Sequence, residues 1–406
     1  MLEDFYDLYD VVIIGGGASG LLCALECARD GMSTLVLEKD QQPARKILVS
    51  GNGRCNLTNR YVSPACYQAD PKLIESTLTH FSFENCCKYF EDLGVLLTEQ
   101  ENGRIFPAAG KSSAITEALK TALKEAGAEI KCAQEVIHIH AAAAKFIITT
   151  QTKDVYHAHN VVLACGSCAY PQVTGTKRGY ELAKSLGHSI VSPLPVLSGL
   201  CLKERALTRL SGVKCQVRTT LQNEPSVQGE GELIFTNYGM NGPAALNISQ
   251  AVSRALINGP VKVEINFFPQ LENPQAFFEK RLEKFGHRKP KDFFAGLLHE
   301  GIINLLIDFM GMRKNMPVNA QNAQRPWQTL LAWPVTVTAL RPWQEAMVTA
   351  GGVKTDEINY NTFESRLCPN LYITGELLDV DGKSGGLNLH FAWASGFTAA
   401  QAIKEK

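Results

Sequence analysis

Residues 9–20 read YDVVIIGGGASG, and this stretch decides the fold of the N-terminal part of the chain. Its apolar half predicts a short buried strand, and the residues after the glycines predict a helix. Gly15, Gly17 and Gly20 occupy the three glycine positions of a dinucleotide-binding fingerprint. They allow a tight turn, close approach of the backbone to a pyrophosphate, and close packing of helix on strand. The helix that follows would direct its unsatisfied N–H groups at the phosphates.

A second apolar run, Thr34 to Leu37, ends at Glu38, which lies 18 residues beyond Gly20. An acid at this place accepts hydrogen bonds from an adenosine ribose. Glycine clusters also form ordinary turns, but strand, turn, helix, strand and terminal acid occur here in the required order. The sequence therefore predicts a Rossmann-like nucleotide-binding unit.

Composition sets limits on size and partners. The chain has 406 residues, which is too long for one simple core and predicts two or three domains. Forty basic and forty acidic residues cancel, so no general attraction to nucleic acid or to an anionic membrane is expected. The twelve cysteines lie mostly in apolar or helical segments, and no apolar stretch approaches membrane-spanning length. We expect a cytoplasmic protein with no nucleic-acid or membrane partner.

The predicted order of strands and helices changes near Pro193-Leu194-Pro195. Before this point, strands and helices alternate; after it come three strand-like runs and then a helical block that has no glycine fingerprint. Towards the C-terminus, strands and helices alternate again. We predict an α/β fold, with a split nucleotide-binding domain formed by 1–193 and 341–406 and an inserted domain at 194–340. The β part of the inserted domain covers about 194–268 and 333–340, and its helical part covers about 270–332.

Within the helical block, residues 274–285, 293–309 and 325–331 are predicted as helices. Residues 41–67, in the N-terminal part, are expected to be irregular because they are rich in Gly, Asn and Arg.

Two further glycine-rich segments contain residues suited to binding a cofactor. Residues 46–59 read KILVSGNGRCNLTN, and residues soon after the second strand of such a fold return towards the pyrophosphate. Residues 375–388 read GELLDVDGKSGGLN and lie between a predicted strand and the last helix. An acid after the strand suits the hydroxyls of a polyol, and backbone N–H groups at a helix N-terminus suit an electron-rich carbonyl oxygen. A flavin needs both contacts, so this segment favours FAD over NAD alone.

These segments resemble the two-dinucleotide-binding flavoprotein superfamily, and more narrowly the BaiN/YhiN-like FAD-dependent oxidoreductase family. The resemblance covers essentially the whole chain, and its hallmark is the run SGNGRCNLTN at residues 50–59. Further matching runs are GRIFP at 103–107, GELIFT at 231–236, GMNGP at 239–243 and TAGGV at 349–353, together with the 375–388 loop. The family implies a glutathione-reductase-type FAD domain with an inserted β-barrel-like and helical region. Its activities include flavin-dependent reduction of conjugated steroid enones and oxidation of an aminoketone.

The resemblance also implies roles for individual residues. The fingerprint glycines would face the pyrophosphate and Glu38 the ribose. Val136 would pair its backbone with adenine, and Arg45 and Lys46 would lie where the chain passes the isoalloxazine ring. The complete set of expected cofactor-binding residues is Gly15, Gly17, Ala18, Ser19, Gly20, Glu38, Lys39, Arg45, Lys46, Ser50, Gly51, Asn52, Gly53, Cys55, Asn56, Val136, Ala164, Gly166, Gly375, Glu376, Asp379, Gly385, Gly386 and Asn388.

The sequence departs from the family pattern at two places. It reads Ala164-Cys165-Gly166 where the family often has an ATG-like turn, and it has His390 where the family often has Gln. Cys165 and Cys168 form a CxxC pair, which we interpret as part of this glycine turn and not as a redox pair. A redox role for Cys55 is disfavoured because no second cysteine lies within a few residues of it. No metal site is expected.

The sequence thus predicts an FAD-dependent oxidoreductase that acts on a small molecule. The expected reaction is NAD(P)H-linked reduction of a conjugated carbonyl compound, or oxidation of a small amine or ketone. No second glycine fingerprint is present, so NAD(P)H would bind only transiently. Asn237, Tyr238 and His390 are candidates for substrate contact, and no catalytic acid is assigned. A flavin-dependent RNA-modifying enzyme and a non-catalytic flavin-binding regulator are the alternatives.

Overall fold

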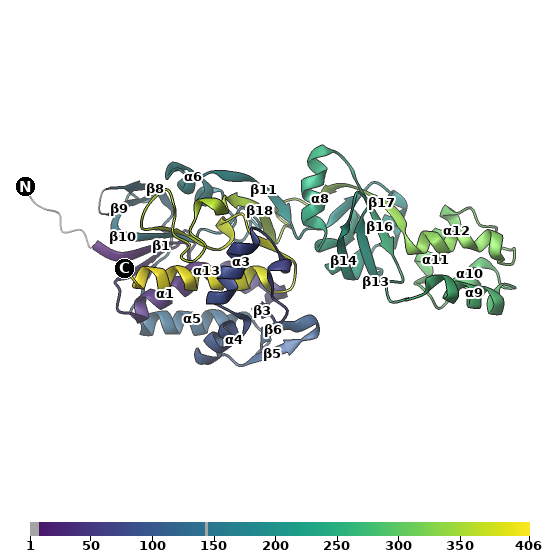
Figure 1. Cartoon of the computed structure of the whole chain (residues 1–406), viewed down its shortest axis with the longest axis horizontal. Coiled ribbons are helices and arrows are strands. Elements are labelled where there is room, and N and C mark those ends of the chain that lie inside the picture. Colours follow the sequence, from purple (N-terminus) through teal and green to yellow (C-terminus); the bar gives the residue numbers. More distant parts are fainter. Residues whose placement is uncertain (1–7, 143–144) are drawn as a thin grey trace, which may run out of the picture. The chain divides into compact units, whose positions relative to one another are not determined.

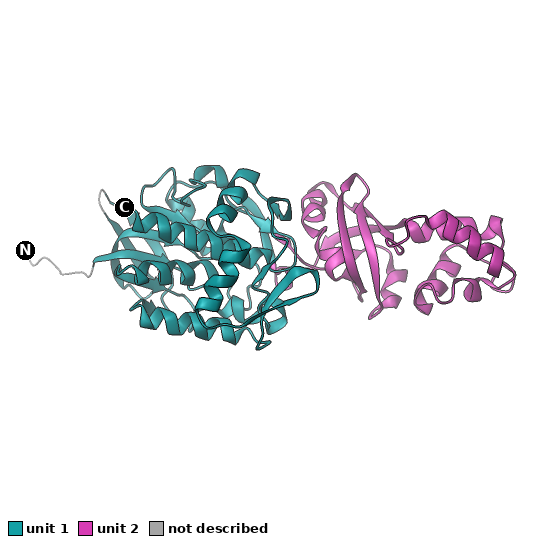
Figure 2. Cartoon of the chain, turned by 60° about the horizontal axis from the view of Figure 1, so that its bottom comes forward, with its two compact units in different colours: residues 1–194, 348–406 teal, residues 195–347 magenta. Residues whose placement is uncertain are grey.

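The computed structural model describes residues 8–142 and 145–406 (Figure 1). The chain divides into two compact units (Figure 2). Unit 1 comprises the residues up to Leu194 together with Val348–Lys406, and unit 2 is Pro195–Met347. The chain returns to unit 1 at Val348, later than the expected residue 341. Residues 341–347 stay with unit 2 because the Arg341 N–H donates to the Gly199 carbonyl (2.8 Å) and the Met347 N–H to the Leu197 carbonyl (3.4 Å).

Unit 1 is built on a seven-stranded sheet with the order β7-β2-β1-β10-β9-β8, and β19 also pairs with β10. β2 and the C-terminal part of β10 pair in parallel with β1, and residues 11–14, 34–37 and 161–163 of these strands are buried, as expected for strands covered on both faces. β10 has two kinds of neighbour: its first half pairs antiparallel with β9 and its second half parallel with β19. The strand bounds are Leu8–Ile14 (β1), Thr34–Leu37 (β2), Glu129–Lys131 (β7), Val136–Ala141 (β8), Phe146–Thr150 (β9), Val155–Leu163 (β10) and Leu371–Ile373 (β19).

Helices α1 (Ala18–Arg29) and α13 (Leu387–Lys404) pack side by side, with α5 (Ser113–Glu125) against α1 (Figure 1). The approach of α13 to α1 is close at Gly396, where a Cβ would lie 2.2 Å from the Ser19 carbonyl oxygen. This packing brings the first and last segments of the chain together at the glycine turns. Other helices of the unit are α3 (Pro71–His80), α4 (Phe83–Asp92) and α6 (Arg178–Ser185).

Regular secondary structure occurs within the segment 41–67, which the sequence predicted to be irregular. Helix α2 (Arg45–Gly53) contains non-helical residues at Ser50, Gly51 and Asn52. The strands β3 (Thr58–Asn59), β6 (Arg104–Pro107) and β5 (Leu97–Gln100) form a small antiparallel sheet. The expectation of an irregular 41–67 is therefore wrong for α2, whose first turn is held by the Ala44 N–H donating to the Gly16 carbonyl (2.8 Å).

Unit 2 contains a closed barrel with the strand order β12-β15-β14-β13-β16-β17. Inward side chains such as Val217, Leu233 and Val335 fill it. The predicted α/β class with a β-barrel in the insertion is confirmed. The strand bounds are Leu200–Leu202 (β12), Lys214–Leu221 (β13), Glu224–Phe235 (β14), Gly239–Asn241 (β15), Val261–Asn266 (β16) and Trp333–Leu340 (β17).

The helical block lies between β16 and β17 in the chain and comprises α9 (Pro274–Phe285), α10 (Pro290–Phe294), α11 (Glu300–Phe309) and α12 (Ala320–Leu331). The predicted single helix 293–309 is wrong: Gly296 has a positive φ of 77° and His299 caps α11. Helix α12 begins earlier than predicted because Asn319 and Asn322 form a reciprocal capping pair. Among the described residues, no helix is both long and apolar enough to cross a membrane.

Candidate functional site

The three fingerprint glycines differ in what surrounds them. A Cβ on Gly15 would lie 2.4 Å from the Ala164 carbonyl oxygen, and one on Gly20 would lie 2.0 Å from the Gly15 carbonyl oxygen. Both glycines are therefore required by packing. A Cβ on Gly17 would meet no atom of the chain within 4 Å. Gly17 is also the N-cap of α1, where no side chain caps the helix and no acid lies in the first turn. The N–H groups at Ala18 and Ser19 thus border open space suited to an anion.

Glu38 is buried and rigidly held beside this turn. The Gly16 N–H donates to its Oε2 (2.7 Å) and the Asp40 N–H donates to its Oε1 (2.8 Å). Burial raises the pKa of the Glu38 carboxyl, whereas these two backbone donors act to lower it. Each carboxylate oxygen keeps acceptor capacity for a further hydroxyl.

Asp40 completes this end of the site. Its Oδ1 forms ion pairs with Lys39 (3.2 Å) and Arg45 (3.0 Å). Its Oδ2 is buried and has no hydrogen-bond partner among the described residues. The segment leading to Val136 is fixed alongside, because the Gln134 N–H donates to the Glu38 carbonyl (2.8 Å).

Arg45 and Lys46, adjacent in the sequence, reach different parts of the site. Arg45 turns to Asp40, whereas the Lys46 ammonium forms a short ion pair with Glu376. The other carboxylate oxygen of Glu376 accepts the Thr349 N–H (3.0 Å). The first turn of α2 therefore connects the Glu38 end of the site to the C-terminal loop.

The hallmark loop adopts a left-handed backbone at several residues. Gly51, Asn52 and Cys55 have φ values of 55°, 57° and 59°. A Cβ on Gly51 would lie 2.7 Å from the Asn56 nitrogen, and the Ser50 hydroxyl donates to the Ile47 carbonyl (2.7 Å). The loop is thus fixed by its own backbone contacts.

Two residues after this turn have contrasting roles. Cys55 is fully buried, and burial raises the pKa of its thiol to about 12, so it remains protonated and unreactive near neutral pH. Asn56 has a buried Oδ1 with no partner among the described residues. A Cβ on Gly386 would lie 2.8 Å from that oxygen. The hallmark loop and the C-terminal loop therefore meet at Asn56.

The C-terminal loop provides a second uncapped helix N-terminus. Gly385 and Gly386 have φ values of 121° and 96°, and no side chain caps α13. Asp379 accepts the Gly351 N–H (2.9 Å). Asn388 donates to the Gly382 carbonyl (2.9 Å) and accepts the Gly382 N–H (2.8 Å), so its amide closes the loop.

Sequence reasoning missed three residues that fix these loops. The Asn59 amide donates to the Gly385 carbonyl (3.0 Å), and the Thr349 and Gly351 N–H groups hold Glu376 and Asp379. Asn59 and Thr349 lie inside the family runs at 50–59 and 349–353, which was the available signal.

The turn after β10 lies against the first glycine turn. The Ala164 N–H donates to the Ile14 carbonyl (2.9 Å), and Gly166 has a φ of 68°. Cys165 and Cys168 are free thiols, and burial raises the pKa of Cys165 to about 12. The geometry thus matches the interpretation of this CxxC as a structural turn.

His390 is fully buried and does not face a substrate. Its Nδ1 lies 2.7 Å from the Thr58 hydroxyl and its Nε2 lies 3.2 Å from the Phe81 carbonyl. Burial lowers its pKa to about 4, so the ring is neutral, with Nε2–H as donor and Nδ1 as acceptor. The expectation of substrate contact is wrong for His390. The other two candidates, Asn237 and Tyr238, lie in unit 2 in the turn before β15.

Taken together, the site offers two helix N-termini without a side-chain cap, the fixed acid Glu38 at one end, and the acids Glu376 and Asp379 at the other. The orphan oxygens of Asp40 and Asn56 and the open space at Gly17 fit a ligand with hydroxyls, a central pyrophosphate and a polar ring edge. FAD has these groups in this order.

Comparison with known proteins gives full-length matches. The family model described as HI0933-like protein Rossmann domain matches residues 9–402. The chain is 33% identical to a 3-dehydro-bile acid delta(4,6)-reductase of Clostridium scindens, covering 97% of this chain and 98% of the relative. It is 29% identical to a ribosomal RNA dihydrouridine synthase of Haemophilus influenzae, with the same coverage of 97% and 98%.

Solved structures share the fold at low identity. A 3-ketosteroid delta1-dehydrogenase of Sterolibacterium denitrificans has a TM-score of 0.53 at 12% identity, covering 98% of this chain and 99% of that one. A 3-ketosteroid-delta4-(5alpha)-dehydrogenase of Rhodococcus jostii RHA1 has a TM-score of 0.51 at 14% identity, covering 100% and 99%.

Proposed function

The chain belongs to the HI0933-like protein family, a family of FAD-dependent oxidoreductases, and on that premise we propose that it reduces a carbon–carbon double bond conjugated with a carbonyl group. The resemblance expressed by residues 50–59 is confirmed by this membership. The observation that carries the proposal is the full-length similarity to a delta(4,6)-reductase of 3-dehydro-bile acids.

The names of the full-length relatives point to one type of chemistry. A 3-oxo compound reduced at its Δ4 position loses a double bond conjugated with the ketone. Dihydrouridine arises when the uracil C5=C6 bond, which is conjugated with the C4 carbonyl, is saturated. Both reactions add a hydride to the carbon β to a carbonyl and a proton to the α carbon. The proposal therefore specifies the type of bond that is reduced, a carbon–carbon double bond conjugated with a carbonyl group, and gives the substrate only as a class.

FAD, once reduced, supplies the hydride in such reactions. We propose that the N-terminus of α1 holds the pyrophosphate at Gly17, Ala18 and Ser19, and that Glu38 accepts the adenosine ribose hydroxyls. Glu376 and Asp379 would accept the ribityl hydroxyls. The N-terminus of α13 at Gly385 and Gly386 would stabilise negative charge on the pyrimidine edge of the ring.

We propose a small conjugated ketone as substrate and NAD(P)H as a transient reductant, and the family's oxidation of a small amine or ketone remains an alternative reaction. The second candidate is an RNA-modifying enzyme, favoured by the dihydrouridine synthase relative of Haemophilus influenzae and by one of Escherichia coli, 28% identical over 97% of this chain. The balanced charge of the chain favours the small molecule.

Anaerobic flavin spectroscopy tests the proposal. The FAD-loaded protein is bleached with NAD(P)H, and a 3-oxo-4-ene steroid acid, its saturated analogue, and uridine-containing ribosomal RNA are added in separate experiments. We expect the enone, and not the saturated analogue, to restore the yellow colour rapidly with formation of the reduced steroid. Reoxidation by RNA with dihydrouridine formation would establish the second candidate. A flavin that no conjugated carbonyl reoxidises would contradict both candidates, and would leave oxidation of an amine or ketone or a binding protein without turnover.

A further inference from the structure

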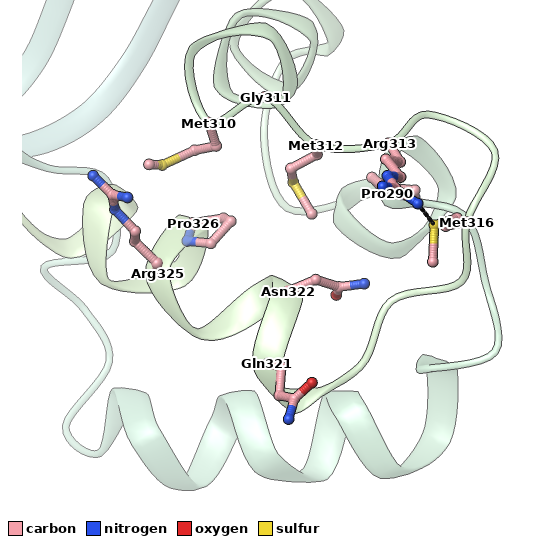
Figure 3. Close-up of a pocket in the computed structure, with 10 residues that line it drawn as sticks. All are labelled: Pro290, Met310, Gly311, Met312, Arg313, Met316, Gln321, Asn322, Arg325 and Pro326. Carbon is pink, nitrogen blue, oxygen red and sulfur yellow. Dashed lines mark hydrogen bonds between the residues drawn. The ribbon is translucent and has the colours of Figure 1, made fainter.

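Unit 2 contains a pocket that the candidate FAD site does not use. It has a volume of about 340 Å³ and lies among α10, α12 and the segment that follows α11 (Figure 3). Small-molecule sites begin at roughly 300 Å³, so this pocket is large enough for a compact organic ligand.

Much of the lining is apolar and adaptable. Met310, Met312 and Met316 line the pocket together with Pro326, and these are three of the seven methionines of the chain. Met316 is 43% exposed, although methionine is normally buried. Methionine side chains are flexible and polarisable, so they fit apolar ligands of varied shape. The lining therefore suits a hydrocarbon body.

Two arginines border the same pocket without a charged partner. Among residues 8–142 and 145–406, no carboxylate lies within 4.0 Å of Arg313 or Arg325. Nearby lysines do have such partners: Lys291 pairs with Glu300 (2.6 Å) and Lys314 with Asp308 (2.9 Å). Figure 3 shows Arg325 on the same side of the pocket as Met310 and Arg313 beside Met316, with Met312 between the two arginines; the Arg313 Nη1 lies 3.5 Å from the Met316 sulfur. Residues 271–332 hold nine Lys or Arg and six Asp or Glu, whereas the whole chain is neutral.

The combination selects a class of ligand. A guanidinium binds a carboxylate through paired hydrogen bonds, and the methionines would cover an apolar body. Single-stranded nucleic acid is disfavoured because its bases stack on aromatic side chains, and no aromatic residue lines this pocket. We propose that this pocket binds a small amphiphilic carboxylate, with the head group at Arg325 or Arg313 and the apolar body against the methionines.

Calorimetric titration of the full chain with dodecanoate, below its micelle concentration, tests this site independently of flavin chemistry. Three variants are compared with the natural protein. The double variant Arg313→Gln/Arg325→Gln removes both charges, Met312→Trp fills the pocket without changing charge, and Arg218→Gln is the matched control. Arg218 lies on the barrel strand β13, where it pairs with Glu230 (2.9 Å). Circular dichroism and thermal unfolding verify that each variant is folded.

We expect dodecanoate to bind, the double variant and Met312→Trp to lose about tenfold or more in affinity, and Arg218→Gln to bind as the natural protein does. Equal affinity for dodecanol would overturn the proposal, because it would show that the charge is not recognised. Binding that the pocket variants do not weaken, or no binding at all, would also overturn it. The proposal would also be overturned if a short single-stranded RNA bound in an arginine-dependent way and dodecanoate did not bind. That result would assign the pocket to nucleic acid.

Discussion

Gly17 and Gly20 belong to one motif, but the structure predicts opposite consequences for their substitution. A side chain at Gly17 would meet no atom of the chain within 4 Å, and its φ of −85° and ψ of −166° suit an L residue. A Cβ at Gly20 would lie 2.0 Å from the Gly15 carbonyl oxygen, so α1 would have to move away from β1. Gly17→Val therefore tests the cofactor, and Gly20→Ala tests the fold.

For Gly17→Val in flavin-free protein, two effects on the free energy of unfolding nearly cancel. Loss of a favourable N-cap residue destabilises by up to about 1 kcal/mol, and reduced freedom of the unfolded chain stabilises by roughly 0.4–1 kcal/mol. The free energy of unfolding should thus change by no more than about 1 kcal/mol. FAD should bind about 100-fold more weakly or worse, because the side chain would displace a phosphate from two charge-assisted hydrogen bonds worth about 1.5–3 kcal/mol each. For Gly20→Ala, we expect a loss of about 3 kcal/mol in the free energy of unfolding even without FAD.

Urea unfolding of flavin-free protein and FAD titration by flavin fluorescence measure the two quantities separately. If Gly17→Val binds FAD as tightly as the natural protein, the pyrophosphate does not lie at the N-terminus of α1. If it unfolds as easily as Gly20→Ala, the space at Gly17 serves packing and not a ligand. Either result would refute the assignment.

Three further predictions follow from buried or paired groups. Glu376→Gln should weaken FAD binding about tenfold in fluorescence titration, since an amide is a poorer hydroxyl acceptor and leaves Lys46 unpaired; unchanged affinity would place the ribityl chain elsewhere. For His390, whose pKa is lowered from 6.5 to about 4, the unfolded chain takes up a proton first, so stability is complete above pH 6.5 and falls by about 1.4 kcal/mol per pH unit towards pH 4. His390→Gln should reduce this slope in urea unfolding at a series of pH values, and an identical slope would contradict a buried neutral ring. Cys55 should resist alkylation by iodoacetamide at pH 8 in the folded protein, as measured by mass spectrometry, because its thiol is buried and protonated. Rapid alkylation of Cys55 would instead indicate a thiolate. In the Cys55→Ala variant, NAD(P)H should still reduce the flavin.

Local sequence patterns were sufficient for elements whose signals lie within a few residues. The fingerprint strand, α1 and the acid at Glu38 follow from spacing alone, and the barrel with its helical insertion follows from the family resemblance. Helix α2 could not be predicted, because its Gly- and Asn-rich C-terminal half has low helix propensity and its start depends on a contact between Ala44 and Gly16. The break between α10 and α11 was hidden because Leu297 and Leu298 continue the apolar pattern across it.

The site itself shows where sequence reasoning stops. Arg45 and Lys46 are neighbours in the chain, yet consecutive side chains on a helix point in different directions, and their partners Asp40 and Glu376 are far apart in sequence. His390 was placed near a substrate because of its position in the last helix. Its partners Thr58 and Phe81 lie more than 300 residues away, and only the tertiary packing of α13 shows that it is buried.

The chemistry of the two ligands explains why the sequence predicts the cofactor better than the substrate. A pyrophosphate and a reduced flavin ring are charged, so backbone N–H groups at two helix N-termini suffice to hold them, and glycine is required wherever that backbone approaches closely. The turns that place these N–H groups are fixed by contacts within the chain, which require glycine at Gly15, Gly20 and Gly386, whereas Gly17 borders open space. A conjugated carbonyl substrate is largely apolar, and many side chains bind an apolar surface equally well. Relatives that share the whole chain can therefore keep the hydride chemistry while one acts on a bile acid and another on ribosomal RNA, and the side chains that distinguish the two need not follow any motif.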